Sequence, residues 1–215
     1  MNISLRSVRV LVGSALAFGS APGSANLIQN GDFEAGATGF RTDYVVAPGD
    51  GSLDAGELVV LPPGQQINVP SNISYPDHTT GTGQALYVNG ATQADRVVWE
   101  QDVTVTPGQA YDFGFFYTNF GFGSGNNDAR IAVLADGVAV GNELQTRDAG
   151  EGPWFEFRLA IGASSDTLTL GLIETSREAS GNDFAIDDLF LTPVPSPAAV
   201  LPLIGLAVLR HRRPG

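Results

Sequence analysis

The sequence predicts an all-β fold, a β-sandwich of jelly-roll type, and three observations support this. Short β-prone runs recur along the chain and are separated by Gly, Asn, Asp and Pro. Several runs alternate apolar and polar residues with the period of half-buried strands. No stretch between residues 26 and 192 has the apolar period of a long helix, and no internal repeat is visible. The runs expected to form strands are Leu27–Ile28, Gly39–Val46, Glu57–Leu61, Gln65–Val69, Gln84–Asn89, Val97–Val105, Ala110–Thr118, Arg130–Ala135, Val138–Val140, Trp154–Ile161, Thr167–Glu174 and Phe184–Thr192.

The alternation also assigns side chains to faces of the sheets. In one run, Val97, Trp99 and Val103 are expected on one face, with Val98 on the other. Because its neighbours on that face are apolar, Trp99 is expected in the core. The dipeptide Asp136-Gly137 separates two β-prone runs and is typical of a tight hairpin turn.

The first 25 residues have the layout of a secretory signal peptide. Arg6 and Arg9 precede an apolar run, Val10–Phe18, and small residues follow as far as Ala25. A basic start, a short apolar centre and a small-residue cleavage site are typical of export signals. Cleavage after Ala25 would make Asn26 the first residue of the folded domain.

The last residues, 193–215, form a second addressing segment. An apolar run, Ala198–Leu209, is followed by Arg210, Arg212 and Arg213. An apolar segment that is stopped by Arg side chains can enter a bilayer. As a helix this run would cover about 18 Å, whereas the hydrocarbon core of a bilayer is about 30 Å thick. We therefore expect a signal that associates with the membrane transiently and is then processed.

Residues 26–192, between these segments, are enough for one domain with a sizeable core. They contain all 23 acidic residues of a chain that has no Lys and a formal net charge of −12. Such a surface repels phosphate backbones, so nucleic acid is not expected as a partner. The chain has no Cys, which excludes disulfides, thiolate catalysis and Cys-ligated zinc.

Catalytic motifs are absent from the sequence. His78 is the only His before the C-terminal segment, which excludes a site built on a pair of His ligands. There is no Gly-x-Ser-x-Gly nucleophile elbow and no phosphate-binding Gly loop with a Lys. Carboxylate pairs of the kind used in glycoside hydrolysis are always available in so acidic a chain. Their presence therefore does not distinguish a hydrolase from a protein without catalytic activity. The expectation is a protein that is not an enzyme.

Four segments resemble motifs of known families. The opening Asn26–Glu34 is similar to the first segment of galactose-binding-like carbohydrate-binding modules, and Phe184–Leu191 resembles their last strand. The apolar run and Arg cluster at the end, after Val194, resemble the PEP-CTERM sorting signal, and Asp77–Gly90 is similar to a segment of many of its members. In this chain the family's Pro-Glu-Pro is Pro195-Ser196-Pro197, without the acidic residue.

These resemblances imply a galactose-binding-like sandwich in an exported protein of exopolysaccharide-forming Gram-negative bacteria. An exosortase-type enzyme would process its tail, and the product would lie at the cell surface or in the extracellular matrix. Its expected role is non-catalytic, either binding an exopolysaccharide or other glycan or contributing structurally to the matrix. A hydrolase that acts on exopolysaccharide and a surface adhesin that recognises protein are the alternatives.

A calcium site is expected where the two ends of the domain meet. Glu34 follows the opening motif, and Asp187 and Asp188 lie in the closing one. First and last strands of a sandwich commonly lie close together, so these carboxylates could converge into the oxygen cage that calcium prefers. Because neighbours on a strand face opposite ways, only one of Asp187 and Asp188 is expected to point toward Glu34. In the resembling modules, this position holds a structural calcium. The alternative is that the carboxylates only accept hydrogen bonds from turns.

Glycan-binding residues are expected in long loops. Aromatic rings pack on the C–H face of a sugar, and planar polar groups bond its hydroxyls. Trp154 follows a Gly-Pro turn, and both core and cleft positions remain open for it. The alternative for the loop aromatics is plain packing under the loops. The candidates are Tyr75, His78, Phe120, Phe122, Asn126 and Asn127.

Overall fold

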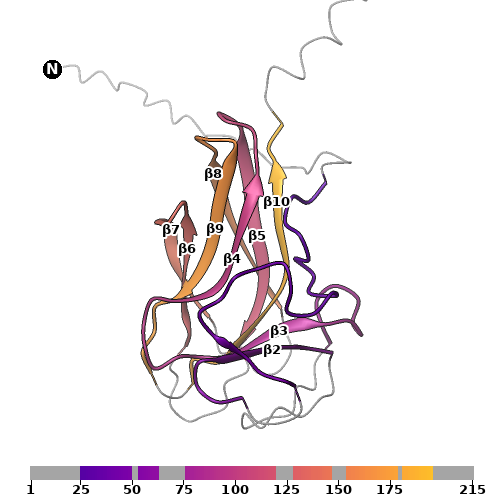
Figure 1. Cartoon of the computed structure of the whole chain (residues 1–215), viewed down its shortest axis with the longest axis vertical. Helices are drawn as coiled ribbons and strands as arrows, with labels where there is room; N and C mark the ends of the chain where they lie inside the picture. Colours follow the sequence, from indigo (N-terminus) through magenta and orange to yellow (C-terminus); the bar gives the residue numbers. More distant parts are fainter. Residues whose placement is uncertain are drawn as a thin grey trace, which may run out of the picture.

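The structure is a two-sheet β-sandwich, shown as a computed structural model in Figure 1. It describes residues 25–49, 53–62, 76–119, 128–146, 154–178 and 181–195, and these residues contain strands but no helix. The prediction of an all-β fold is therefore confirmed, while the jelly-roll type and the domain boundaries stay predictions. The strands are β1 (Val45–Val46), β2 (Glu57–Leu61), β3 (Ala85–Asn89), β4 (Arg96–Thr104), β5 (Ala110–Asn119), β6 (Arg130–Ala135), β7 (Val138–Gln145), β8 (Phe155–Gly162), β9 (Thr167–Glu174) and β10 (Phe184–Pro193).

The larger sheet has six strands in the order β1-β2-β3-β10-β5-β8. β1 runs parallel to β2, and all other neighbours are antiparallel. In Figure 1, β2 and β3 cross the lower end of the sandwich, while β5, β8 and β10 run along its length. The last strand of the chain, β10, is thus a central strand of the sheet.

The smaller sheet has four antiparallel strands in the order β4-β9-β6-β7. Asp136 and Gly137 join β6 to β7 with φ angles of 51° and 77°. Positive φ at both central residues is what the tightest hairpin turns require, and Asp and Gly tolerate it. The expected hairpin is confirmed, although β7 continues to Gln145, beyond the expected end at Val140.

The main core lies between the two sheets and is built from the alternate residues that the strand period points inward. β5 contributes Phe113, Phe115 and Tyr117, and β9 contributes Leu168 and Leu170. Each of these side chains is at most 5% exposed. Burying such side chains removes apolar surface from water and is the main force that holds the sheets together.

Trp99 has no exposed surface, which confirms its expected place in the core. The face expected for Val97 is wrong. The pairing of β4 with β9 shifts between Val97 and Trp99, and Val98 is fully buried while Val97 is only partly buried. A β-bulge inserts an extra residue into the strand, so the alternation is interrupted there.

The N-terminal part of the domain contains less strand than expected. Leu27 donates one backbone hydrogen bond to Leu191 but belongs to no strand. Within the expected strand Gly39–Val46, only β1 and an isolated bridge between Arg41 and Glu100 form. The side chain of Asn30 bonds to Gly36 O and Thr38 O, which holds the preceding segment in turns. The expected strand Gln65–Val69 lies outside the described residues.

The two ends of the described chain meet beside β10. Asn26 donates to Leu189 O, and its side-chain oxygen accepts from Leu191 N at 3.0 Å. At the other end, Pro195 is exposed. The signal peptide and the sorting residues Pro197, Arg210, Arg212 and Arg213 lie outside the described residues. Within the part of the chain that the structure describes, no helix is long and apolar enough to span a bilayer.

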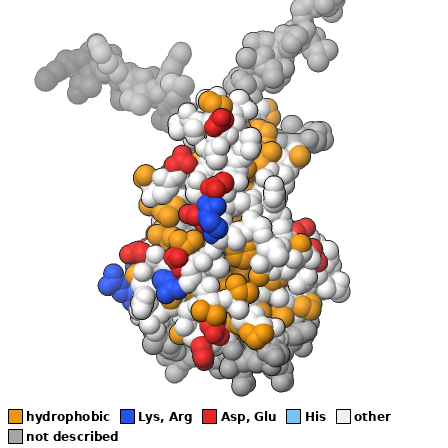
Figure 2. Space-filling model, viewed as in Figure 1, with side chains coloured by type: hydrophobic (Ala, Val, Ile, Leu, Met, Phe, Trp, Pro, Cys, Tyr) orange, Lys and Arg blue, Asp and Glu red, His pale blue; other side chains and the backbone are white. Residues whose placement is uncertain are grey.

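Charged side chains on the surface pair with one another. On the face in Figure 2, arginine side chains lie next to acidic ones. Arg41 contacts both Glu100 and Asp102 at 2.8 Å. The hydrogen bonds that Arg41 donates to Asp102 lower the pKa of Asp102 to about 2. Such exposed pairs contribute little to stability, but they neutralise the few cations that this acidic chain has.

Candidate functional site

The site is built on a bulge in β10. Asp187 lies opposite Phe116 of β5, whereas Phe190 lies opposite Gly114, so Asp188 and Leu189 together face a single residue of β5. Asp188 has φ of 49°, a left-handed conformation that Asp adopts more readily than most residues. Because the bulge adds one residue, the side chain of Leu189 points into the main core, where it is 1% exposed.

The bulge brings two adjacent carboxylates to the same side. We call the side of the six-stranded sheet that faces away from the main core the outer face. Asp187 and Asp188 both point from this face to the segment at residues 78–79. The expectation that they face opposite ways is therefore wrong, because strict alternation holds only in a regular strand.

The segment that follows Asp77 is held to β10 by these carboxylates. Oδ2 of Asp187 accepts hydrogen bonds from the backbone N–H groups of His78 at 2.8 Å and Thr79 at 3.2 Å. Asp188 accepts from the Thr79 hydroxyl at 2.8 Å, and its other oxygen lies 2.6 Å from Nδ1 of His78. Asp77 in turn accepts from Thr80 N and Gly83 N, so it closes the loop on itself.

Asp187 is fully buried, and this changes its acidity. Burial, and then the neighbouring charge of Asp188, raise the pKa of Asp187 to about 7, although hydrogen bonds from Asp188, His78 and Thr79 act in the opposite direction. Burial disfavours the charged form of a carboxyl group, and a like charge nearby adds to this. The carboxyl group therefore holds its proton to a much higher pH than a free Asp.

Aromatic side chains surround His78. Its ring stacks on Phe116, with 3.5 Å between the ring centroids and an angle of 14° between the planes. Trp154 approaches the same imidazole edge-on at 6.0 Å. The indole N–H of Trp154 donates to Pro76 O at 3.0 Å. Trp154 thus packs over the outer face, beside His78, and outside the main core.

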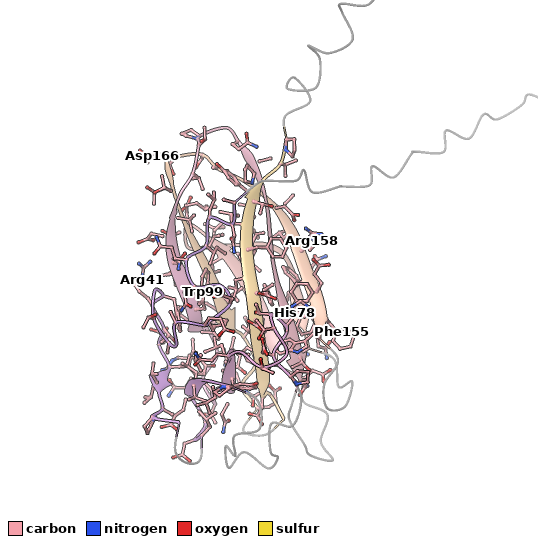
Figure 3. All side chains as sticks on the ribbon, turned by 90° about the vertical axis from the view of Figure 1, so that its right-hand side faces the viewer. Arg41, His78, Trp99, Phe155, Arg158 and Asp166 are labelled. Carbon is pink, nitrogen blue, oxygen red and sulfur yellow. The ribbon has the colours of Figure 1, made fainter. Side chains whose placement is uncertain are left out.

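Phe190 forms a second aromatic surface farther along β10. Its ring lies so close to Gly114 that a Cβ at this glycine would be 2.4 Å from the ring. The guanidinium of Arg158 lies 5.1 Å from the centre of the Phe190 ring, at a distance typical of a cation–π contact. Arg158 itself is bound to Asp112 at 2.7 Å and contacts Glu156 at 3.5 Å. Figure 3 shows Arg158 and His78 on the same side of the molecule.

A cavity of about 500 Å³ lies between the N-terminal segment and the bulge of β10. We call it the outer cavity. Its volume is in the range of small-molecule and glycan sites in proteins. Aromatic, apolar and carboxylate groups share its wall. The lining residues are Asn26, Ile28, Asn30, Gly31, Asp32, Phe116, Asp188, Leu189 and Phe190.

The structure places only some of the expected site residues. Glu34 accepts a hydrogen bond from Gln84 N at 3.0 Å, whereas Asp187 and Asp188 contact residues 78–79 of the same segment. Among the described residues, no group of three or more His, Asp or Glu side chains has the geometry of a metal site. Calcium binding therefore stays a prediction. Tyr75, Phe120, Phe122, Asn126 and Asn127 lie outside the described residues.

Sequence reasoning missed the strand residues of the site. The pattern of residues places Phe116 and Phe190 in strands without assigning them a role, and it gives no signal for Arg158 or Asp32. One signal was available, because β5 has Phe at both Phe115 and Phe116, and adjacent residues of a strand face opposite ways. One of the two must therefore leave the core and offer its ring to the outer face.

Comparison with solved structures agrees with this architecture. The chain resembles the CBM22-1–CBM22-2 tandem domain of Xyn10C from Paenibacillus barcinonensis at 16% identity, with a TM-score of 0.50 over 83% of this chain and 47% of that one. It also resembles arabinose-bound α-L-arabinofuranosidase MgGH51 at 15% identity, with a TM-score of 0.52 over 81% of this chain and 27% of that one. A third similar structure is TmCBM61 in complex with β-1,4-galactotriose, at 17% identity and a TM-score of 0.48, with 79% and 99% of the two chains covered.

The chain has the β-sandwich fold of carbohydrate-binding modules. At these identities the similarity establishes the fold but does not establish the activity. No protein-family model and no curated protein sequence matches the chain.

Proposed function

We propose that this protein binds a glycan without catalysis, through the outer face of the six-stranded sheet. The observation that carries the proposal is the outer cavity, in which the rings of Phe116 and Phe190 lie beside the carboxylates of Asp188 and Asp32. Apolar ring surface next to a few polar groups is the combination that a sugar requires, because a pyranose has both C–H faces and hydroxyls. Solved structures with the same fold include carbohydrate-binding modules, which supports the proposal.

Replacing Phe190 by Ala tests this proposal. The variant should lose most of the glycan binding seen on a glycan array while keeping a cooperative unfolding transition, since Phe190 lies outside the main core. Val138→Ala is the matched control, because Val138 is 65% exposed on β7 of the other sheet. Equal binding by both variants and the wild type would exclude the outer cavity as the site.

A hydrolase is the second candidate, and one observation favours it. Asp32 and Asp188 line the same cavity, and glycoside hydrolysis uses a pair of carboxyl groups that flank the bond. Turnover of labelled matrix glycans, abolished by Asp32→Asn or Asp188→Asn, would establish the enzyme. Retention of intact glycan without turnover would support the binding module.

We further propose that the protein is exported and is sorted through its tail by an exosortase-type enzyme to the cell surface or the extracellular matrix. The support is the order of the terminal segments, with Arg6 and Arg9 before an apolar run at one end and Arg210 after another at the other end. Intact-mass analysis of the native protein should show loss of residues 1–25 and of residues beyond about Val194. A full-length tail on the secreted protein would refute processing.

We also propose that the protein binds calcium where the two ends of the domain meet. Glu34 and the Asp187–Asp188 pair both contact the segment at residues 78–84, and carboxylate oxygens are suitable calcium ligands. Calcium should raise the unfolding temperature of the protein, because a ligand of the folded state stabilises it by mass action. Glu34→Gln should remove this gain. An unfolding temperature that does not respond to calcium or to a chelator would dismiss the site.

A further inference from the structure

The outer cavity offers hydrogen-bond acceptors but few free donors. Asn30 also lines the cavity, but its amide nitrogen already donates to Gly36 O at 2.8 Å and to Thr38 O at 2.9 Å. An amide has only two N–H groups, so both are in use. Asn26 donates one of its two amide N–H groups to the backbone of β10, at Leu189 O. These two side chains shape the wall of the cavity by holding its backbone.

The two carboxylates of the cavity keep accepting capacity. Each oxygen of Asp188 has one protein partner, the Thr79 hydroxyl or the His78 ring, while a carboxylate has about four lone-pair positions in all. Asp32 accepts only a long bond of 3.4 Å from Glu34 N among the bonds of the described residues. A ligand that enters the cavity therefore meets accepting oxygens at these two carboxylates.

The arginine that contacts the cavity wall does not offset the negative charge of these carboxylates. Arg158 contacts the ring of Phe190, but Asp112 and Glu156 bind its guanidinium at 2.7 Å and 3.5 Å. Two carboxylates thus balance one positive charge at the edge of the site. The other cations of the chain are few, since it has no Lys and carries a net charge of −12.

We propose, building on the glycan-binding function above, that the outer cavity in its calcium-free form selects neutral glycans and rejects uronate-containing ones. Sugar hydroxyls donate to Asp32 and Asp188 while a C–H face packs on the ring of Phe190. A sugar carboxylate would be brought next to these same carboxylates, and like charges in such an arrangement repel. The selectivity follows from the cavity wall and does not depend on the identity of the hexose.

Matched oligosaccharide pairs test this inference on the full-length protein. Oligogalactosides are compared with oligogalacturonides, and cello-oligosaccharides with oligoglucuronides, at equal chain length and in the presence of a chelator that prevents bridging by calcium. The neutral member of a bound pair should bind more tightly by about tenfold or more. Added NaCl should weaken the discrimination, because salt screens the repulsion of the uronate.

Asp32→Asn shows whether the cavity is the origin of the selectivity. The variant replaces an acceptor by a group that also donates, so it should narrow the preference for the neutral sugar by about several-fold. Asp166→Asn is the control with the same chemical change, and Figure 3 shows Asp166 at the end of the molecule away from His78. Asp166→Asn should leave the preference as in the wild type.

The outcomes separate this inference from the function on which it rests. Equal or tighter binding of the uronate member would overturn the selectivity but leave glycan binding in place. A neutral preference that Asp32→Asn does not change would locate the selectivity elsewhere and would also overturn the inference. If no glycan binds, neutral or acidic, the proposed function itself is wrong.

Discussion

The two faces of the six-stranded sheet use the same strands for different purposes. On β5 and β10, Phe113, Phe115 and Leu191 point to the main core and have no exposed surface. On the opposite side, Phe116 and Phe190 are only partly buried, and both line a cavity. The inner face therefore holds the sheets together, whereas the outer face has aromatic side chains that a ligand can reach.

The difference lies in how each face holds its side chains. Phe115 packs among other aromatic rings, including Phe157 at a centroid distance of 5.1 Å. Phe190 instead rests on a glycine and beside one arginine, and Phe116 is covered by one histidine. Side chains that are only partly buried can change with less effect on the fold than fully buried ones. This asymmetry predicts that substitutions on the two faces differ sharply in their effect on stability.

The largest effect is expected from truncation on the inner face. Phe115→Ala should lower the free energy of unfolding by about 3–5 kcal/mol, because it leaves a cavity among fully buried rings. Phe116→Ala, its neighbour on the outer face, should cost less, about 1–2 kcal/mol, since part of that ring is already in contact with water. Chemical unfolding of both variants measures the difference. Equal losses would contradict the division of the two faces.

A pH effect of intermediate size is expected at the end of the sandwich where β10 begins. Asp183 is 6% exposed there, accepts from Gly90 N, and lies near buried Glu174. Burial is the main cause that raises the pKa of Asp183 from 3.8 to about 6. Between these two pH values the folded protein holds a proton that the unfolded chain has released. The contribution of Asp183 to stability should therefore be most favourable below about pH 4 and fall as the pH rises to about 6, by about 3 kcal/mol in all.

Asp183→Asn isolates this contribution, since it keeps an oxygen for Gly90 N but cannot lose a proton. The difference in unfolding free energy between the variant and the wild type should grow as the pH rises from 4 to 6. This comparison cancels the effect of other groups that titrate nearby, such as Asp187. A difference that is independent of pH would show that Asp183 is ionised in the folded protein at pH 4.

The smallest of the three effects on stability is expected at Gly114, which lies under the Phe190 ring on the outer face. Gly114→Ala places a methyl group 2.4 Å from the Phe190 ring and 2.6 Å from the backbone oxygen of Phe157, so both the ring and the adjacent backbone of β8 must shift. Overpacking of this kind costs about 1–3 kcal/mol, and here it should also abolish glycan binding. Gly162→Ala is the matched control, because Gly162 ends the neighbouring strand and a Cβ there meets nothing within 4 Å. Intact glycan binding by Gly114→Ala would remove Phe190 from the site.

Much of the fold was predictable because its signals are local. The strands around Glu57, Phe113 and Leu170 follow from β-prone runs with period-two alternation, and Asp136-Gly137 alone indicates a hairpin. The central core position of Trp99 follows from its apolar neighbours on the same face. The expected strand at Leu27 did not form, and of the expected strand Gly39–Val46 only Val45–Val46 and a bridge at Arg41 formed. Between them, side-chain bonds of Asn30 to Gly36 O and Thr38 O hold the chain in turns.

The site was less predictable, because bulges do not show in the pattern of residues. Val97 and Asp188 were both assigned by alternation, and in both strands the register shifts next to these residues. His78 was chosen as a loop residue with suitable chemistry, and its contacts with Phe116 and Asp188 depend on residues far away in the chain. No local rule brings such distant residues together.

The sequence by itself determined that this chain is all-β, where most of its strands run, and that Trp99 enters the core. These properties depend on the alternation of apolar residues along a strand, which every short segment displays independently of the rest. Only the tertiary structure decided that Asp187 and Asp188 face the same way and that Phe190 lies open beside Arg158. Both depend on the pairing of β10 with β5, because a bulge forms only when two complete strands are matched and one residue is left over.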